Sequence, residues 1–207
     1  MHLLFEKLVQ EIEFTGNMKQ DIQQFLTANH SPGTAEHCMD VGTEARRIAQ
    51  LYYADPERAE LAGWLHDISA VFPNEERIEA ARQLGIDILP EEEQFPMIIH
   101  QKLSKVMARD IFGVQDAEVL DAVGCHTTLR ADASQLDLVL FVADKIAWDQ
   151  QGIPPYIEEL HHNLAISLEH AAFAYIQYLW ERKDTLKVIH PWLADAYEQL
   201  YVQLNAE

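Results

Sequence analysis

The sequence predicts an all-α protein, a bundle of roughly eight to ten helices in a single domain. Three observations lead to this prediction. Apolar residues recur at helical spacing through nearly the whole chain. Only eight glycines and eight prolines occur among 207 residues, so turn signals typical of a β-rich protein are scarce. A chain of this length normally forms one domain and can bury about 70% of its unfolded surface, so it needs no disulfide or metal merely to fold.

The first half of the chain contains apolar stripes and recognisable helix starts. Stripes at helical spacing cover residues 4–12 and 37–52. Asp55-Pro56 is typical of an N-cap followed by proline at the first helical position, which predicts a helix to about Val71. Asn74 is expected to cap a further helix that stops at Gly85. Residues 86–96 are expected to form a loop.

The second half repeats this pattern. Asp116 is an expected N-cap, and Ser134 with Asp137 three residues later resembles a capping box. Asn163 is expected to open a long helix. The loop of residues 149–155 contains one glycine and two prolines. Helices are therefore expected over residues 99–111, 116–123, 135–148, 163–183 and 191–204.

The charge balance excludes several classes of function. Fifteen basic and 34 acidic residues give a net charge of −19, whereas a general nucleic-acid binder needs a basic face. Docking on an anionic membrane is disfavoured for the same reason. Two cysteines do not make a disulfide scaffold. Residues 1–14 lack a signal-peptide pattern, and no apolar run approaches about 18 residues, so a cytoplasmic protein is expected. Whether the chain forms a homodimer stays open.

A His-Asp pair within AGWLHDISA is the first candidate for chemistry. Alone it is weak, because such a pair is more often a core histidine bonded to its neighbour. Other histidines and one aspartate also lie on apolar stripes of different predicted helices, where an unpaired polar group is costly. A shared counter-ion explains them better than separate structural roles. The candidate residues are His37, His66, Asp67, His100, His126 and Asp144.

This set of side chains favours a pair of metal ions. Imidazole and carboxylate ligands suit iron, manganese or zinc. Six ligands are too many for one open ion but suit two ions with a bridging carboxylate, which together activate water and clamp phosphoryl oxygens. Without the ions, Asp67 and Asp144 would lie close together, and like-charge repulsion is expected to raise the pKa of at least one of them.

The order H…HD…H…H…D resembles that of the HD-domain metal-dependent phosphohydrolases. The segments EHCMDVGTEARRIAQLY, AELAGWLHDIS, CHTT and LDLVLFVADKI are similar to the YqeK-like branch of symmetrical bis(5'-nucleosyl)-tetraphosphatases. The resemblance covers roughly residues 34–180. It implies an HD-type helical core there, with N-terminal helices in 1–33 and C-terminal helices in 181–207. It also implies two metal ions, with iron expected, and cleavage of diadenosine tetraphosphate to two ADP.

The resemblance also implies roles for individual residues. One metal would be held by His37, His66, Asp67 and Asp144. The second would be held by His100 and His126, with Asp67 bridging the two ions as the catalytic residue. Apart from the resemblance, Lys145 and Arg130 are remaining cations that could contact the phosphates of a nucleotide substrate. An ordinary surface role is an equal alternative for Lys145 and the favoured one for Arg130.

Several positions depart from the family pattern, and two of them change a charge. Thr34 stands where the family tends to have arginine, and Ala70 where it tends to have lysine. Both changes remove a cation that could face a polyphosphate. They leave two alternatives open: a non-catalytic protein that binds metal and nucleotide, or an enzyme with the same metal core that acts on another phosphoester or as a di-iron oxygenase.

Other polar groups are interpreted as structural. The acidic run Glu91–Glu93 is expected to be a solvated loop. Two overlapping Glu-x-x-His patterns in residues 158–162 are expected to be a solvated helix face. Cys38 and Cys125 are expected to pack in the core, and His190 has no partner at useful spacing.

Overall fold

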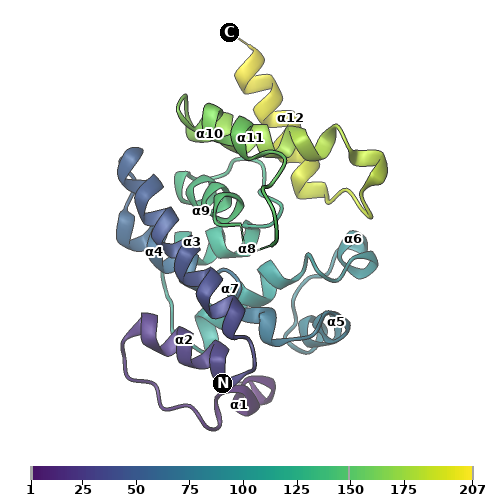
Figure 1. The fold of residues 1–207 in the computed structure, drawn as a ribbon. Helices are drawn as coiled ribbons and strands as arrows, with labels where there is room; N and C mark the ends of the chain where they lie inside the picture. Colours follow the sequence, from purple (N-terminus) through teal and green to yellow (C-terminus); the bar gives the residue numbers. More distant parts are fainter. Residues whose placement is uncertain (1, 149, 207) are drawn as a thin grey trace.

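The computed structural model describes residues 2–148 and 150–206, which form α-helices and short 3-10 helices and no strand (Figure 1). The prediction of an all-α fold is confirmed. Twelve α-helices are more than predicted, because short helices occur in segments that the sequence did not single out. They are α1 (Leu3–Val9), α2 (Met18–Ala28), α3 (Pro32–Leu51), α4 (Pro56–Leu65), α5 (Asn74–Gln83), α6 (Pro90–Gln94), α7 (His100–Asp110), α8 (Ala117–Cys125), α9 (Gln135–Ile146), α10 (Ile157–Leu164), α11 (Leu168–Trp180) and α12 (Pro191–Asn205), with the 3-10 helices η1 (Ile68–Val71) and η2 (Lys183–Thr185).

Helices α3, α4, α8 and α9 pack together at the centre of the molecule. Helix α7 lies along α8, while α11 covers α9 and carries α10 and α12 on its other sides. Figure 1 shows the N-terminal helices at one end of the molecule and α10–α12 at the other. The central helices bury large apolar side chains completely, among them Ile48, Leu65 and Phe141.

Two glycines let α3 and α4 approach closely. A Cβ atom added to Gly63 would lie 2.5 Å from the Cα atom of Gly42, and one added to Gly42 would lie 2.4 Å from the Trp64 side chain. Neither distance leaves room for a methyl group. The two helices therefore meet backbone to backbone, which brings residues near the start of α3 close to the end of α4.

Helix α4 ends earlier than predicted. The expected helix over 56–71 stops at Leu65, and the chain turns at Asp67 before continuing as η1. Hydrogen bonds to α7 hold this turn, because the Ser69 backbone N–H donates to Oγ of Ser104 at 3.1 Å and the Ser69 hydroxyl donates to the His100 carbonyl at 2.8 Å. These contacts come from residues distant in sequence, so helical periodicity did not reveal the break.

The predicted helix starts at Asp116 and Ser134 are confirmed. The Asp116 carboxylate accepts the backbone N–H groups of residues 118 and 119. Ser134 and Asp137 form the expected capping box at the start of α9. The expected long helix over 163–183 is wrong, because α10 ends at Leu164 and a separate cap, Ser167, begins α11.

The acidic run Glu91–Glu93 is not a solvated loop, because Glu92 is completely buried. Its carboxylate accepts the Leu89 backbone N–H at 2.8 Å and Nζ of Lys102 at 2.8 Å, and it lies 3.3 Å from Nε2 of His190. Two partners are distant in sequence, so the local composition did not indicate them. This buried cluster ties α6 to α7 and to the start of α12.

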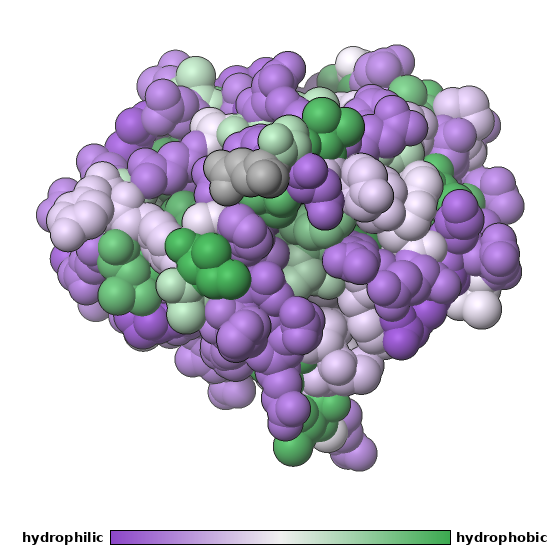
Figure 2. Space-filling model, turned by 90° about the horizontal axis from the view of Figure 1, so that it is seen from above, coloured by the Kyte–Doolittle hydropathy of each residue, from purple (hydrophilic) through white to green (hydrophobic). Residues whose placement is uncertain are grey.

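The face shown in Figure 2 is mostly hydrophilic, and its hydrophobic residues gather in small separate groups. This arrangement is ordinary for the surface of a folded protein. No helix within residues 2–148 and 150–206 is long and apolar enough to cross a membrane.

Candidate metal centre

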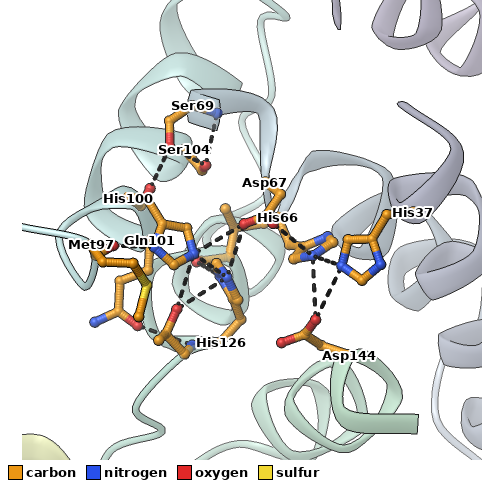
Figure 3. A network of polar contacts seen from close by, with 12 residues as sticks. His37, His66, Asp67, Ser69, Met97, His100, Gln101, Ser104, His126 and Asp144 are labelled. Atoms are coloured by element: carbon orange, nitrogen blue, oxygen red, sulfur yellow. Dashed lines mark hydrogen bonds and ion pairs between the residues drawn. The ribbon is translucent and has the colours of Figure 1, made fainter. Parts of the chain in front are cut away.

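The structure brings together all six candidate side chains, which come from five α-helices and the turn before η1 (Figure 3). His66 and His126 each end a helix, and His100 begins one, so their rings project from helix termini into a common space. His37 lies in α3 and Asp144 in α9, while Asp67 occupies the turn after α4. Each histidine is buried.

One half of the cluster joins His37, His66 and Asp144. Nε2 of His66 lies 3.2 Å from Nε2 of His37. Oδ1 of Asp144 lies 3.3 Å from Nε2 of His37 and 3.6 Å from Nε2 of His66. These three side chains thus direct two nitrogens and one oxygen at the same point.

Asp67 connects this half to the other. Its Oδ2 lies 3.7 Å from Nε2 of His66, whereas its Oδ1 lies 3.0 Å from Nε2 of His100 and 3.4 Å from Nε2 of His126. Nε2 of His100 and Nε2 of His126 are 2.9 Å apart. The carboxylate therefore offers one oxygen to each half, which is the geometry of a bridging ligand.

Backbone carbonyls fix the tautomers of three rings. Nδ1 of each ring contacts the carbonyl three residues earlier in the chain, and a carbonyl oxygen only accepts hydrogen bonds. Nδ1 must therefore carry the proton, and Nε2 of the neutral ring presents a lone pair. The Nδ1–oxygen distances are 2.7 Å for His66, 2.5 Å for His100 and 2.8 Å for His126.

These lone pairs fit a cation. Carboxylate oxygens and imidazole lone pairs facing one another repel unless a positive charge lies between them. Oδ1 of Asp67 is buried and has no hydrogen-bond partner, although two histidine nitrogens lie near it. Three combinations of these side chains bring their ligand atoms within 4.8 Å of one another. Nitrogen and oxygen donors of this kind, with three of the four rings oriented by a second hydrogen bond, suit a divalent transition metal.

The pKa values of Asp67 and Asp144 show that the cluster favours the negatively charged form of both carboxylates. Burial alone raises the pKa of Asp67, but His66 and His100 outweigh it and hold that pKa well below its usual value. Burial alone would also raise the pKa of Asp144. The charge of Lys145 and the hydrogen bond with His37 outweigh burial and hold that pKa well below its usual value. The expectation that repulsion raises one of these pKa values is wrong, because both values are lowered.

A cavity of about 280 Å³ opens beside the cluster, and all of the six side chains except His66 line it. Besides five of them, its walls include the aromatic residues Trp148, Tyr156 and Tyr175, together with Thr127 and Lys145. The Thr127 hydroxyl lies 3.1 Å from Nε2 of His100 and 3.2 Å from Nε2 of His126.

Lys145 places a buried cation in this cavity. Its Nζ lies 2.5 Å from Oδ2 of Asp144 and 3.3 Å from the carbonyl of His126. Burial lowers the pKa of Lys145, but Asp144 more than offsets this and raises it above its usual value. The ammonium group therefore stays charged at neutral pH.

The structure does not bring Arg130 to the cavity. Its Nε donates to Oδ2 of Asp137 at 2.9 Å, and it lines a different cavity together with Lys105. Thr34 and Ala70 are also not among the residues that line the metal-centre cavity. Of the two predicted phosphate contacts, only Lys145 faces the candidate metal ligands.

Sequence reasoning missed the aromatic wall of the cavity. Tyr156 and Tyr175 lie beyond the metal ligands in the chain, and their rings are 4.7 Å apart. Tyr175 also packs against Phe141, a core residue of α9. Aromatic residues on a helix usually indicate core, so nothing in their spacing distinguished them. The cysteines are buried as predicted, and burial raises the pKa of Cys38.

The chain is similar to several known proteins. A model of the family described as "HD domain" matches residues 34–149. A protein of Lactococcus lactis subsp. cremoris named "Uncharacterized protein in pepC 5'region" is 44% identical over 164 residues, which are 79% of this chain and 82% of that protein. A Staphylococcus aureus protein named "Bis(5'-nucleosyl)-tetraphosphatase, symmetrical" is 31% identical over 112 residues, which are 53% of this chain.

The match to the Staphylococcus aureus protein spans only 56% of that protein's length. Among solved structures, a Clostridium acetobutylicum protein described as a predicted HD superfamily hydrolase involved in NAD metabolism has a TM-score of 0.81 at 25% identity. That likeness covers 89% of this chain and 97% of the other. The family model spans more than half of the chain and includes all six side chains of the centre. The chain therefore belongs to the HD domain family.

Proposed function

We propose that this protein is a metal-dependent phosphohydrolase that cleaves nucleotides or dinucleoside polyphosphates, foremost diadenosine tetraphosphate to two ADP. The observation that carries the proposal is the convergence of three Nε2 lone pairs and an unpaired Asp67 oxygen beside a buried lysine. Relatives from Staphylococcus aureus and Bacillus subtilis, each 31% identical over 112 residues, are named symmetrical bis(5'-nucleosyl)-tetraphosphatases.

In this proposal two divalent ions, with iron expected, occupy the two halves of the cluster. Such ions would supply Lewis-acid activation of water and neutralise phosphoryl oxygens. One ion would be held by His37, His66, Asp67 and Asp144, and the other by His100 and His126, with Asp67 as the bridge. Because one Asp67 oxygen faces each half, this carboxylate would fix the spacing of the two sites.

Lys145 would bind the substrate. Its ammonium group lies at the cavity wall with two polar partners, which leaves one of its three N–H donors for a phosphate oxygen. A cation at this place matters because the protein carries a net charge of −19 and would otherwise repel a polyphosphate. Its buried position also strengthens the attraction.

The decisive experiment is metal analysis of protein purified without added metal, followed by hydrolysis assays on diadenosine tetraphosphate. We expect close to two ions per chain and release of ADP. A folded, fully metallated sample that releases no ADP above buffer would overturn the proposal. Measuring a panel of nucleoside phosphates at equal metal loading would separate a nucleotidase from a tetraphosphatase.

A second candidate is a non-catalytic protein that binds metal and nucleotide. Thr34 and Ala70 favour it, because each stands where the family tends to carry a cation. The same assays distinguish the two: this candidate predicts full metal loading and nucleotide binding without turnover.

A further inference from the structure

A second cavity, of about 210 Å³, adjoins the one over the metal centre. Met97, Thr127 and Tyr175 line both cavities, so the two share a wall. Met97 is drawn beside His100 in Figure 3, where its carbonyl oxygen accepts the Nδ1 hydrogen bond of that ring. A ligand bound at the metal centre could therefore extend past Met97 into the second cavity.

The walls of this adjoining cavity are apolar. Phe95, Leu179, Leu186, Val188 and Ile189 line it, and all five are only half-buried, so they are not fully covered by other side chains. Within residues 2–148 and 150–206, no acidic residue lines it. A cavity whose walls are mostly apolar side chains is suited to an uncharged ring.

The polar groups of the cavity already have partners within the protein. The Thr128 hydroxyl donates to the Leu129 carbonyl at 2.9 Å, and Nε2 of His190 lies 3.3 Å from the buried Glu92. Nζ of Lys187 lies 4.6 Å from the centre of the Phe95 ring, as a cation–π contact. Aromatic and apolar surfaces therefore dominate what the cavity offers a ligand.

The volume of the adjoining cavity, and the chain segment that forms its wall, suit one portion of a substrate rather than a whole ligand. Pockets for whole ligands hold about 300–1,000 Å³, so 210 Å³ suits one ring system, with its phosphates in the 280 Å³ cavity next door. Most of the lining residues come from 175–193, which lies outside the segment 34–149 matched by the HD family model. The metal ligands lie inside that segment.

We infer that this adjoining cavity binds the aromatic base of a nucleoside phosphate whose phosphates lie at the metal centre, and that residues 175–193 set the preference for such substrates. The inference rests on the proposed function, because it requires phosphate to bind at the metal centre. The base would pack against Phe95 and Val188. The sulfur of Met97 would add a favourable contact with an aromatic ring.

Filling the cavity tests this inference. Val188→Phe places a ring on its wall, and Val202→Phe is the matched control because Val202 is 66% exposed on α12. Calorimetry on the metal-loaded proteins would compare ADP with methylenediphosphonate, a pyrophosphate analogue that has no base and resists hydrolysis. We expect Val188→Phe to weaken ADP binding about tenfold or more, with methylenediphosphonate affinity within about twofold and no change in Val202→Phe.

Two results would overturn the inference: an equal loss for both ligands, or no loss for ADP. If Val188→Phe does not fold, as judged by its melting curve, Val188→Thr has nearly the same shape and adds a hydroxyl, and it should weaken ADP binding selectively. Selective loss of ADP binding in a protein that hydrolyses nothing would support the cavity and reject the proposed function. If the protein hydrolyses diadenosine tetraphosphate but Val188→Phe leaves ADP affinity unchanged, the proposed function is supported and the base-binding cavity is rejected.

Discussion

Nε2 of His100 lies 2.9 Å from Nε2 of His126, and neither nitrogen carries a proton in the neutral ring. A hydrogen bond between them would need one ring to be doubly protonated. Burial and the neighbouring histidines outweigh the pull of Asp67 and lower the pKa of His126 to about 4, so this ring holds no second proton at neutral pH. The Nε2 atom of His126 is therefore free to bind a metal cation at neutral pH.

Removing the bridging carboxylate should release both ions. Asp67→Ala takes one oxygen from each half of the cluster, whereas His100→Ala removes a ligand from one half only. We expect metal analysis to find neither ion retained in Asp67→Ala and mainly the second ion weakened in His100→Ala. Full two-metal occupancy of Asp67→Ala would remove the bridge from the proposal.

Chelation should lower the melting temperature at neutral pH. Ions at 100 times their dissociation constant add about 2.7 kcal/mol, which corresponds to about 5–10 °C for a protein of this size. The effect should shrink near pH 5.5, because protonated histidines already bind metal weakly. Differential scanning calorimetry with and without chelator tests this. Identical curves at pH 7 after verified metal loss would contradict it.

Lys145→Met should lower kcat/KM on a nucleoside polyphosphate at constant metal content. Losing a desolvated charged contact costs about 2–5 kcal/mol, or roughly 30-fold and upward in rate. Arg130→Met is the comparison, because Arg130 bonds Asp137 away from the cavity. We expect less than about threefold loss per folded molecule for that variant. Equal losses in the two would remove Lys145 from substrate binding.

Ala70→Lys should raise kcat/KM on diadenosine tetraphosphate. Ala70 lies in η1, three residues after Asp67, where a long cationic side chain could reach a phosphate. A regained charged contact is expected to give at least about a tenfold increase. Ala70→Met supplies a long side chain without the charge and should give no increase. A flat rate in Ala70→Lys would mean that the protein favours another phosphoester.

Glu92→Gln should destabilise the protein by about 3 kcal/mol at neutral pH, because breaking a buried charged pair leaves Lys102 uncompensated. Glu93→Gln, the exposed neighbour that pairs with Arg82, should cost less than about 1 kcal/mol. Urea denaturation of both variants measures the difference. Similar losses in the two would contradict a special role for Glu92.

The Glu92 effect should also depend on pH. Burial alone raises the pKa of Glu92, but hydrogen bonds from His190, Leu89 and Lys102 outweigh it and hold the pKa below the ordinary value of 4.5. A lowered pKa adds stability that is fully present above the unfolded-state value and is lost as the pH falls through the folded-state value. The difference in stability between wild type and Glu92→Gln should therefore shrink as the pH falls below about 4.5.

The sequence predicted the helices with strong apolar periodicity and the six clustered side chains, because each of the six is a polar residue within an apolar stretch. It did not predict features that depend on contacts between distant segments. Glu92 and His190 lie 3.3 Å apart although 98 residues separate them. The break after Leu65 likewise depends on Ser69 meeting α7. Local periodicity contains no information about such pairs.

The scatter of the six side chains along the chain, from position 37 to position 144, also constrains how the protein folds. Closing such long loops is entropically costly, so the unfolded chain rarely gathers more than a few of these groups. The complete cluster forms only when α3, α4, α7, α8 and α9 have docked. Contacts that are absent from the folding transition state mainly slow unfolding, so we expect bound ions to act chiefly on the unfolding rate.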